Sequence, residues 1–358
     1  MAVYLLYMIS PLLIEAMYRT AVPRARFDNE RTRNRYIVLC GIVMFLMIGL
    51  RSYQNGSGDS KIYYELWRRA RNLPLNMYFR VDMEKGFLLS IWILSRLFAE
   101  QQWVFLFSGA FFAIAVSRFV EKYCDDACLA FVVFNCLGLF NFYVQGMRQS
   151  IAMGICMFAI DFCKERKLLQ FLGVVVTAMC FHGSAVVFFV VYPIWGMKLS
   201  TRNLIFAVLA AMIAFRSLGW FFSIGNQIIE DHYAIGDTRL TSGGGFTLAI
   251  HIVCVMVGLL LAAQSKRNES VFTNISFFAY MTIICAVCFA MRYSVTTIME
   301  RVSFFFTFGE MLLISKSTKL AVRSQRSLIR LIVIALCFGV AVHKAGYSSL
   351  VPYRFFWM

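Results

Sequence analysis

The stretch FTLAIHIVCVMVGLLLAAQ, residues 246–264, carries one histidine and no Asp, Glu, Lys or Arg. A run of this length and composition is typical of a helix that crosses a bilayer, which takes about 20 apolar residues. The whole chain has the same character, because 60% of its 358 residues are apolar, only 15% are charged, and the mean hydropathy is +0.69. This composition excludes a soluble enzyme and predicts one integral membrane domain over residues 1–358.

Similar apolar windows recur along the chain and predict an all-α polytopic membrane protein. The windows lie at residues 3–18, 36–53, 86–98, 102–119, 127–145, 147–163, 168–181, 184–197, 203–226, 246–264, 271–290, 298–315 and 327–343. The first window has no basic region before it and no convincing small-residue cleavage site after it. We therefore expect a retained helix there rather than a removed signal peptide.

Basic residues between the windows orient them, because short cytoplasmic loops retain Lys and Arg. The basic groups lie at residues 19–35, 118–122, 164–167, 198–202, 266–267 and 316–330. Placing all of these inside leaves residues 54–85, an outer loop with an amphipathic helix, and the outer loop 227–245 on the other side. The window 86–98 is short and carries Arg96, so we predict an interfacial or re-entrant helix there. About twelve crossings remain, with both termini outside.

The formal net charge of +16 and the eleven cysteines also have to be interpreted in a membrane protein. A basic excess supplies topology signals and contacts with anionic membrane lipids, and we expect no nucleic acid partner. Most cysteines lie in or beside apolar windows, where Cys behaves as a small hydrophobe, so we predict no disulfide framework. Neither Cys124 with Cys128 nor Cys285 with Cys288 has a second ligand pair at zinc-like spacing, and we predict no metal site and no cofactor.

Polar side chains at the predicted outer helix ends indicate a shared polar cavity on that face. The sharpest element is NFYVQGMRQSIAMG, residues 141–154, where Arg148 and Gln149 begin a helix directly after Gly146. A guanidinium fork, a side-chain amide and free backbone N–H groups would there point together at an anion such as phosphate. The alternative is that Arg148 only snorkels at the start of its helix.

Two further ionisable residues stand out. In CFHGSAVVFFVVYPI, residues 180–194, His182 ends one helix and Gly183 and Ser184 turn into the next. This histidine would act as a base, as a donor to phosphate or as a cap of the helix hairpin, and the residues alone favour the cap. Glu310 lies in the middle of an apolar window, where we expect a pairing with a neighbouring helix rather than a place in a proton relay.

Seven short pieces of the chain, taken in order, resemble a known family. They are GDSKIYYELW, EKGF, GMRQSIAMGICMFAI, CFHGSAVVFFVVYPI, SGGGFTLAIHIV, RVSFFF and VPYRFFW, and the resemblance covers nearly the whole chain from about residue 36 onward. They follow the pattern of the EpsG family, bacterial polytopic proteins similar in role to the Wzy polymerases of O-antigen, capsule and exopolysaccharide. The resemblance implies a glycosyltransferase with a GT-C-like fold that uses undecaprenyl-diphosphate-linked oligosaccharides at the outer face of the bacterial inner membrane. A chain-length regulator is an expected protein partner.

The implied chemistry is assigned to particular residues. An inverting transfer needs a base near the acceptor hydroxyl and positive charge on the leaving diphosphate. Asp59, Glu84 and His182 are the candidate bases, with the two carboxylates ranked first, and we expect partial burial to raise the pKa of Glu84. No DxD motif is present, which favours a metal-independent enzyme. The remaining candidates are Arg148, Gln149, Arg239, Arg292 and Arg301 as diphosphate ligands, and Tyr63, Ser184 and Tyr353 as other substrate contacts.

Other functions compete with polymerisation. A transporter, or flippase, of lipid-linked saccharide would also need many helices and basic residues. It should carry them through the depth of a central cavity, whereas here they cluster outside, with Arg216 as the main exception. An O-antigen ligase is a second rival. A membrane acyltransferase would use a His as its base, but the basic cytosolic pocket that should surround this His is lacking.

Overall fold

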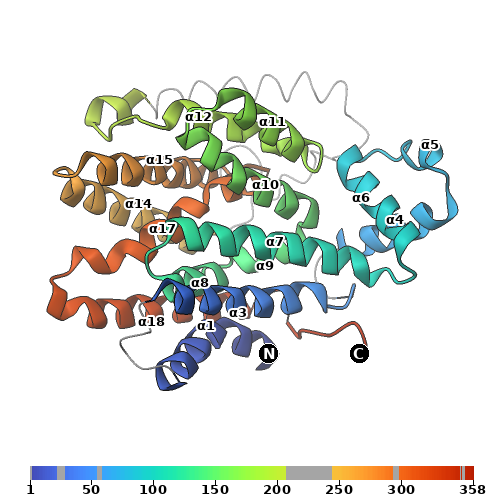
Figure 1. Ribbon diagram of the computed structural model, residues 1–358, viewed down its shortest axis with the longest axis horizontal. Coiled ribbons are helices and arrows are strands. Elements are labelled where there is room, and N and C mark those ends of the chain that lie inside the picture. Colours follow the sequence, from blue (N-terminus) through green and yellow to red (C-terminus); the bar gives the residue numbers. More distant parts are fainter. Residues whose placement is uncertain are drawn as a thin grey trace. The chain divides into compact units, whose positions relative to one another are not determined.

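The protein is described from a computed structural model that covers residues 2–21, 29–54, 59–206, 244–292, 298–346, 348 and 351–358. Every named element in these residues is a helix, which confirms the predicted all-α class (Figure 1). The described residues contain one isolated antiparallel bridge, between Arg51 and Phe355. The chain divides into two compact units: residues 1–192 with 314–358 form unit 1, and residues 193–313 form unit 2.

Five helical stretches in the described residues are long and apolar enough to cross a membrane. They are α3 (Glu30–Gly49), α7 (Gln102–Tyr123), α14 (Gly245–Ser265), α15 (Glu269–Met291) and the stretch Arg323–Ala345 that contains α18 (Arg326–Ala345). Each corresponds to one predicted apolar window. The other described windows form shorter or less apolar helices, among them α1 (Ala2–Ala21), α8 (Ala127–Cys136), α9 (Leu139–Gln145), α10 (Met147–Lys164) and α11 (Leu168–Met179).

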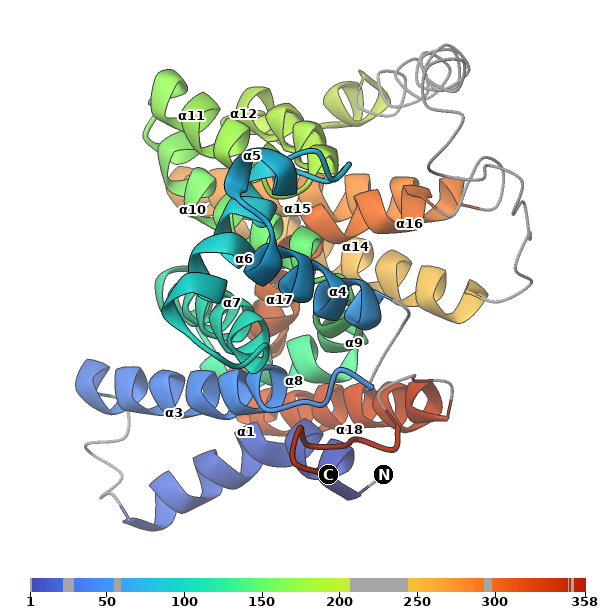
Figure 2. The same cartoon turned by 90° about the vertical axis from the view of Figure 1, so that its right-hand side faces the viewer.

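In unit 1, α3 and α7 lie side by side in both views (Figures 1 and 2). Glycines on both helices bring their backbones close together, as small residues do in membrane helix pairs. A Cβ added to Gly49 would lie 2.9 Å from the Leu106 side chain, and one added to Gly109 would lie 3.1 Å from that of Ile48. Larger residues at these positions would force the two helices apart.

Basic side chains from the predicted inner segments gather at one end of unit 1. Arg33, near the start of α3, donates to the carbonyl oxygen of Cys124 at 2.8 Å, just after the end of α7. Three ion pairs join the same end: Lys316 with Asp125 at 2.7 Å, Arg330 with Asp126 at 2.6 Å, and Lys122 with Asp161 at 2.7 Å. Residues 29–35, 118–126 and 316–330 therefore lie together, as a common inner face requires.

At the opposite end of unit 1 lie α4 (Asp59–Asn72), α5 (Leu75–Tyr78) and α6 (Lys85–Leu97). The predicted amphipathic helix of the segment 54–85 is α4. Arg71 of α4 donates to the Phe98 carbonyl beyond α6 at 2.8 Å, and Arg96 of α6 donates to the Leu73 carbonyl beyond α4 at 3.0 Å. Each arginine thus satisfies carbonyls at the end of the other helix, which explains the charge inside the apolar window. With 13 residues, α6 is about 20 Å long, shorter than the hydrocarbon core.

Unit 2 contains α14, α15, α16 (Ile298–Ser303) and most of α17 (Phe308–Lys316). The Asn268 side chain caps α15 by accepting from the Val271 backbone N–H at 3.1 Å. A Cβ on Gly309 would lie 2.7 Å from the Phe278 carbonyl oxygen, so this glycine lets α17 approach α15 closely. Most of the predicted outer loop 227–245, with Arg239, lies outside the described residues.

Candidate functional site

Three of the predicted site residues meet in unit 1. Glu84 is the N-cap of α6, Arg148 lies in the first turn of α10, and His182 lies between α11 and η1 (Gly183–Val190). Nδ1 of His182 lies 2.8 Å from Oε1 of Glu84. Nη1 of Arg148 forms an ion pair with Oε2 of the same carboxylate, and the Gly183 backbone N–H donates to Oε1 at 3.3 Å. One carboxylate therefore joins the guanidinium and the imidazole.

The residues of the EKGF piece explain how Glu84 reaches this position. The Gly86 backbone N–H donates to the Cys180 carbonyl oxygen at 2.9 Å, and a Cβ on Gly86 would lie 2.7 Å from that oxygen. Only glycine allows α6 to begin this close to the end of α11. The Lys85 ammonium donates to the carbonyls of Phe79 and Val81, at 2.8 and 2.9 Å, and so holds the turn that precedes α6.

Arg148 is positioned by the break between α9 and α10. Gly146 is the N-cap of α10, as the sequence predicted, and its carbonyl oxygen accepts from both the backbone and the hydroxyl of Ser150. The Arg148 guanidinium therefore lies beside the positive end of an 18-residue helix. Tyr63 of α4 acts on this guanidinium electrostatically and through a side-chain hydrogen bond, and its ring packs edge-on against Phe87.

The pKa of Glu84 differs from our expectation. Burial does raise it by desolvation, but the hydrogen bond from His182 and the charge of Arg148 outweigh this effect and lower the pKa of Glu84 to about 2. Glu84 is thus ionised at neutral pH and only accepts hydrogen bonds. His182 must then donate its Nδ1–H to Glu84, which leaves Nε2 as the ring nitrogen available to a substrate. In the described residues, Nε2 has no hydrogen-bond partner.

The site is partly open to water. The exposed fractions of the side chains are 21% for Glu84, 18% for Arg148 and 14% for His182. Two buried polar atoms beside these groups, Nε of Arg148 and the hydroxyl of Ser184, have no hydrogen-bond partner within the described part of the chain. The arrangement offers a bound substrate one basic nitrogen, one cation and two unused polar groups.

The other predicted site residues have different environments. Asp59 begins α4, but its side chain lies outside the described residues, as does Arg239. Gln149 is 3% exposed. Tyr353 is buried and donates to the Met47 carbonyl oxygen at 2.6 Å, so its hydroxyl holds the C-terminal segment against α3. Arg292 and Arg301 belong to unit 2, where Arg292 pairs with Glu300 at 2.8 Å.

Arg51 is a buried arginine of unit 1 that the sequence reasoning missed. It is fully buried, donates to the Ser60 hydroxyl at 3.2 Å and lies over the Phe105 ring, 4.6 Å from its centroid. The C-terminal segment covers it, because the Ser52 backbone N–H donates to the Arg354 carbonyl at 2.9 Å. The available signal was a single arginine at the outer edge of the window 36–53.

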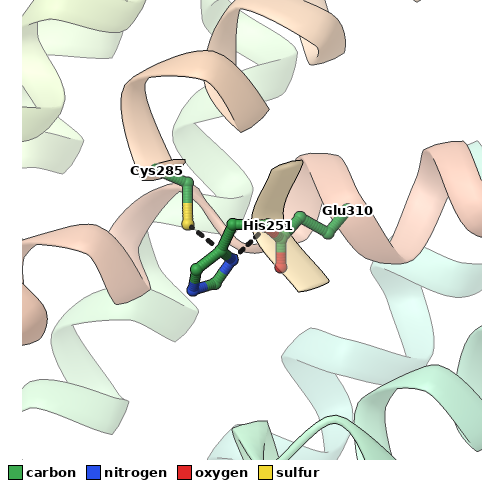
Figure 3. Close-up of side chains that lie close together, drawn as sticks. All are labelled: His251, Cys285 and Glu310. Atoms are coloured by element: carbon green, nitrogen blue, oxygen red, sulfur yellow. Dashed lines mark hydrogen bonds and ion pairs between the residues drawn. The ribbon is translucent and has the colours of Figure 1, made fainter. Parts of the chain in front are cut away.

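Unit 2 contains a second cluster, formed by His251 of α14, Cys285 of α15 and Glu310 of α17 (Figure 3). Nδ1 of His251 lies 2.5 Å from Oε1 of Glu310 and 3.7 Å from Sγ of Cys285. The expected pairing of Glu310 with a neighbouring helix is confirmed. All three side chains are buried.

The helices and the site formed by Glu84, Arg148 and His182 define the class of the protein. It is a multi-pass, all-helical membrane protein with a half-buried basic site. Residues 34–355 match the EpsG family, and the chain belongs to it. No curated protein and no solved structure matches the chain. Membership of this family supports a role in polysaccharide biosynthesis.

Proposed function

We propose that this protein is a polysaccharide polymerase of the Wzy type. It transfers a growing glycan from undecaprenyl diphosphate to a lipid-linked repeat unit at the outer face of the inner membrane. The observation that carries this proposal is the joining of His182 and Arg148 by Glu84, because glycosyl transfer from a diphosphate needs a base and a cation close together. Family membership supports the same reaction class.

His182 is the proposed base. The acceptor hydroxyl attacks the anomeric carbon of the donor glycan, its proton passes to Nε2 of His182, and the bond from that carbon to the diphosphate oxygen breaks. Because the hydroxyl attacks from the face opposite the leaving diphosphate, the configuration at the anomeric carbon is inverted. Glu84 is the positioning residue, because it holds the ring through Nδ1 and stabilises the imidazolium that forms. Its lowered pKa makes Glu84 itself a weak base, so we now place it behind His182, while Asp59 stays an untested candidate.

Arg148 is the proposed principal ligand of the diphosphate. Glu84 holds its Nη1, which fixes the guanidinium, while its unpartnered Nε and the N-terminus of α10 are suited to a phosphate oxygen. Gln149, Arg239, Arg292 and Arg301 are proposed as further ligands. With a lipid diphosphate as the leaving group, arginines supply the charge that a divalent ion supplies elsewhere, so the transfer itself is metal-independent.

A cavity of about 320 Å³ at the same end of unit 1 suits the saccharide part of the substrate. Its lining combines the rings of Tyr64 and Trp67 with the polar groups of Arg68, Asn72 and Glu100. Aromatic faces and planar polar groups are the surfaces that bind sugar rings and hydroxyls. Because α4 carries both Tyr63, beside Arg148, and four of the five cavity residues just named, we propose that the acceptor glycan lies along this helix.

The proposed topology keeps about twelve crossings, a GT-C-like arrangement and an outer site. The five candidate spans, the short α6 and the basic end of unit 1 support it. Cysteine labelling in intact cells tests it. Residues of the loop 54–85 should react without lysis, and labelling of this loop only after lysis would contradict the outer location of the site.

Purified protein incubated with a synthetic lipid-linked repeat unit tests the reaction. Polymerisation gives a ladder of longer lipid-linked glycans, whereas a flippase in vesicles would move the unit between leaflets without lengthening it. His182→Gln should abolish the ladder. A matched control is Glu165→Gln, which alters an exposed carboxylate that pairs with Lys167 at 2.8 Å. A normal ladder from His182→Gln would show that this site does not catalyse the transfer.

A further inference from the structure

We propose that His251, Cys285 and Glu310 bind one divalent transition-metal ion, with Zn²⁺ the best match, and that this ion cross-links the helices of unit 2. The three residues come from α14, α15 and α17, and the close-up shows their polar groups turned toward one another (Figure 3). Cys285 and Glu310 follow His251 by 34 and 59 residues along the chain, so no spacing motif reveals the cluster in the sequence.

The distances between the candidate ligand atoms are close to those that zinc requires. The three atoms all lie within 4.8 Å of one another, with Sγ of Cys285 3.7 Å and Oε1 of Glu310 2.5 Å from Nδ1 of His251. Tetrahedral zinc, with bonds of about 2.0 to 2.3 Å, places neighbouring ligand atoms roughly 3.3 to 3.6 Å apart. The sulfur is already near this separation, and the carboxylate has to open by less than about 1 Å.

The identity of the ligands selects the class of metal. Imidazole and thiolate suit zinc and its neighbours in the first transition row, whereas calcium and magnesium require oxygen ligands throughout. One nitrogen, one sulfur and one carboxylate oxygen form a mixed set that zinc accepts, with a fourth position left for a water or another small ligand.

Charge and burial favour the same ion. The side chains of His251 and Glu310 are 5% and 1% exposed, and Cys285 is fully buried. An uncompensated net charge in such surroundings would be strongly unfavourable. A divalent ion bound by one thiolate, one carboxylate and one neutral imidazole has no net charge, so binding leaves the interior neutral. Because each ligand belongs to a different helix, the ion would stabilise their packing, and this role is independent of glycosyl transfer.

The test uses the full-length protein purified in detergent without chelators and with added Zn²⁺. Elemental analysis should find roughly one zinc per chain in the wild type and a large loss in Cys285→Ala and Glu310→Gln. The matched control is Cys288→Ala, one turn further along α15, which should keep its zinc. Less than about a tenth of an ion per wild-type chain, or full zinc in Cys285→Ala, would overturn the proposal and leave a hydrogen-bonded cluster without metal.

A second measurement decides the question even if the variants misfold. Co²⁺ in place of Zn²⁺ should give the wild-type protein a thiolate-to-cobalt charge-transfer band, and Zn²⁺ should slow alkylation of Cys285 but not of Cys288. A wild-type protein with no such band and no protection of Cys285 contradicts the site.

Discussion

The two units each contain a histidine bonded through Nδ1 to a glutamate, but the surroundings of the two pairs differ. In unit 1, His182 and Glu84 are 14% and 21% exposed, and the third member is the cation Arg148. In unit 2, His251 and Glu310 are 5% and 1% exposed, and the third member is the thiol of Cys285. The same pair is therefore partly open and beside a cation in unit 1, and closed and beside a cysteine in unit 2.

This difference shows that a histidine–carboxylate pair does not define a function by itself. A substrate has to reach the imidazole, and a neighbouring group has to stabilise the charge that develops, and only the pair in unit 1 meets both conditions. The closed pair is suited to holding helices together. Substitutions in the two units should consequently have different effects, on turnover in unit 1 and on stability in unit 2.

Loss of the open imidazole should have the largest effect. His182→Ala should reduce the rate of polymerisation by about 10²-fold to 10⁴-fold, because it removes the proton acceptor. The rate of ladder formation per folded molecule measures this effect. His251→Ala is the matched variant in unit 2, and it should keep a near-normal rate per folded molecule. Equal losses of rate in both variants would remove the distinction between the two pairs.

Changing the guanidinium should have the next largest effect. Arg148→Lys keeps the charge but loses the planar fork, so we expect turnover to fall by roughly 10²-fold or more. Arg19→Lys, at an exposed arginine that pairs with Glu15 at 2.7 Å, is the control. Polymer of normal length and yield from Arg148→Ala, with normal membrane insertion, would exclude the proposed contact with diphosphate.

Gly86→Ala tests how the carboxylate is positioned. The new Cβ would lie 2.7 Å from the Cys180 carbonyl oxygen, so α6 has to move away from His182. We expect turnover to fall by about 10-fold and stability by about 1 to 3 kcal/mol. Steady-state rates and thermal unfolding measure the two effects. Gly173→Ala in α11 is the control, because a Cβ there meets no atom within 4 Å.

In unit 2, Glu310→Gln should lower stability without slowing the reaction. The amide keeps the shape of the carboxylate but changes the hydrogen bond between Glu310 and His251, which we expect to cost about 1 to 3 kcal/mol. Thermal unfolding in detergent measures this loss, and the rate per folded molecule should stay near that of the wild type. A rate that falls along with stability would place Glu310 in the catalytic machinery.

The smallest expected effect is that of pH on stability near neutrality. The folded-state pKa of Glu84 is lowered from 4.5 to about 2, so the stability that its ionisation contributes is fully present above about pH 4.5. This contribution is lost as the pH falls from there towards 2. The difference in melting temperature between wild type and Glu84→Gln should be constant from pH 8 to about 5 and shrink below. A difference that changes steadily between pH 8 and 6 would contradict the lowered pKa.

The sequence predicted more of the fold than of the site. Apolar run length identified the five candidate spans, and Gly146 correctly marked the start of α10. The residue types at Glu84, Arg148 and His182 were also recognised, because a charged or titratable group at a membrane helix end is rare and costly. These signals are local, and sequence alone reveals them.

What sequence reasoning did not predict depends on contacts between distant residues. The direction of the Glu84 pKa is set by partners 64 and 98 positions away, and burial alone suggested the wrong sign. Arg96 was recognised as unusual, but only the packing of α4 on α6 shows that it binds backbone carbonyls. The cluster around Cys285 was missed for the same reason.

The exchange of arginines between α4 and α6 has a mechanical consequence. Because Arg71 and Arg96 each bind the terminal carbonyls of the other helix, neither helix can tilt alone without leaving carbonyls unpaired. We therefore expect Tyr63, on α4, and Glu84, at the start of α6, to move together. If the acceptor binds in the cavity along α4 as proposed, its binding energy would be coupled to the alignment of His182 and Arg148.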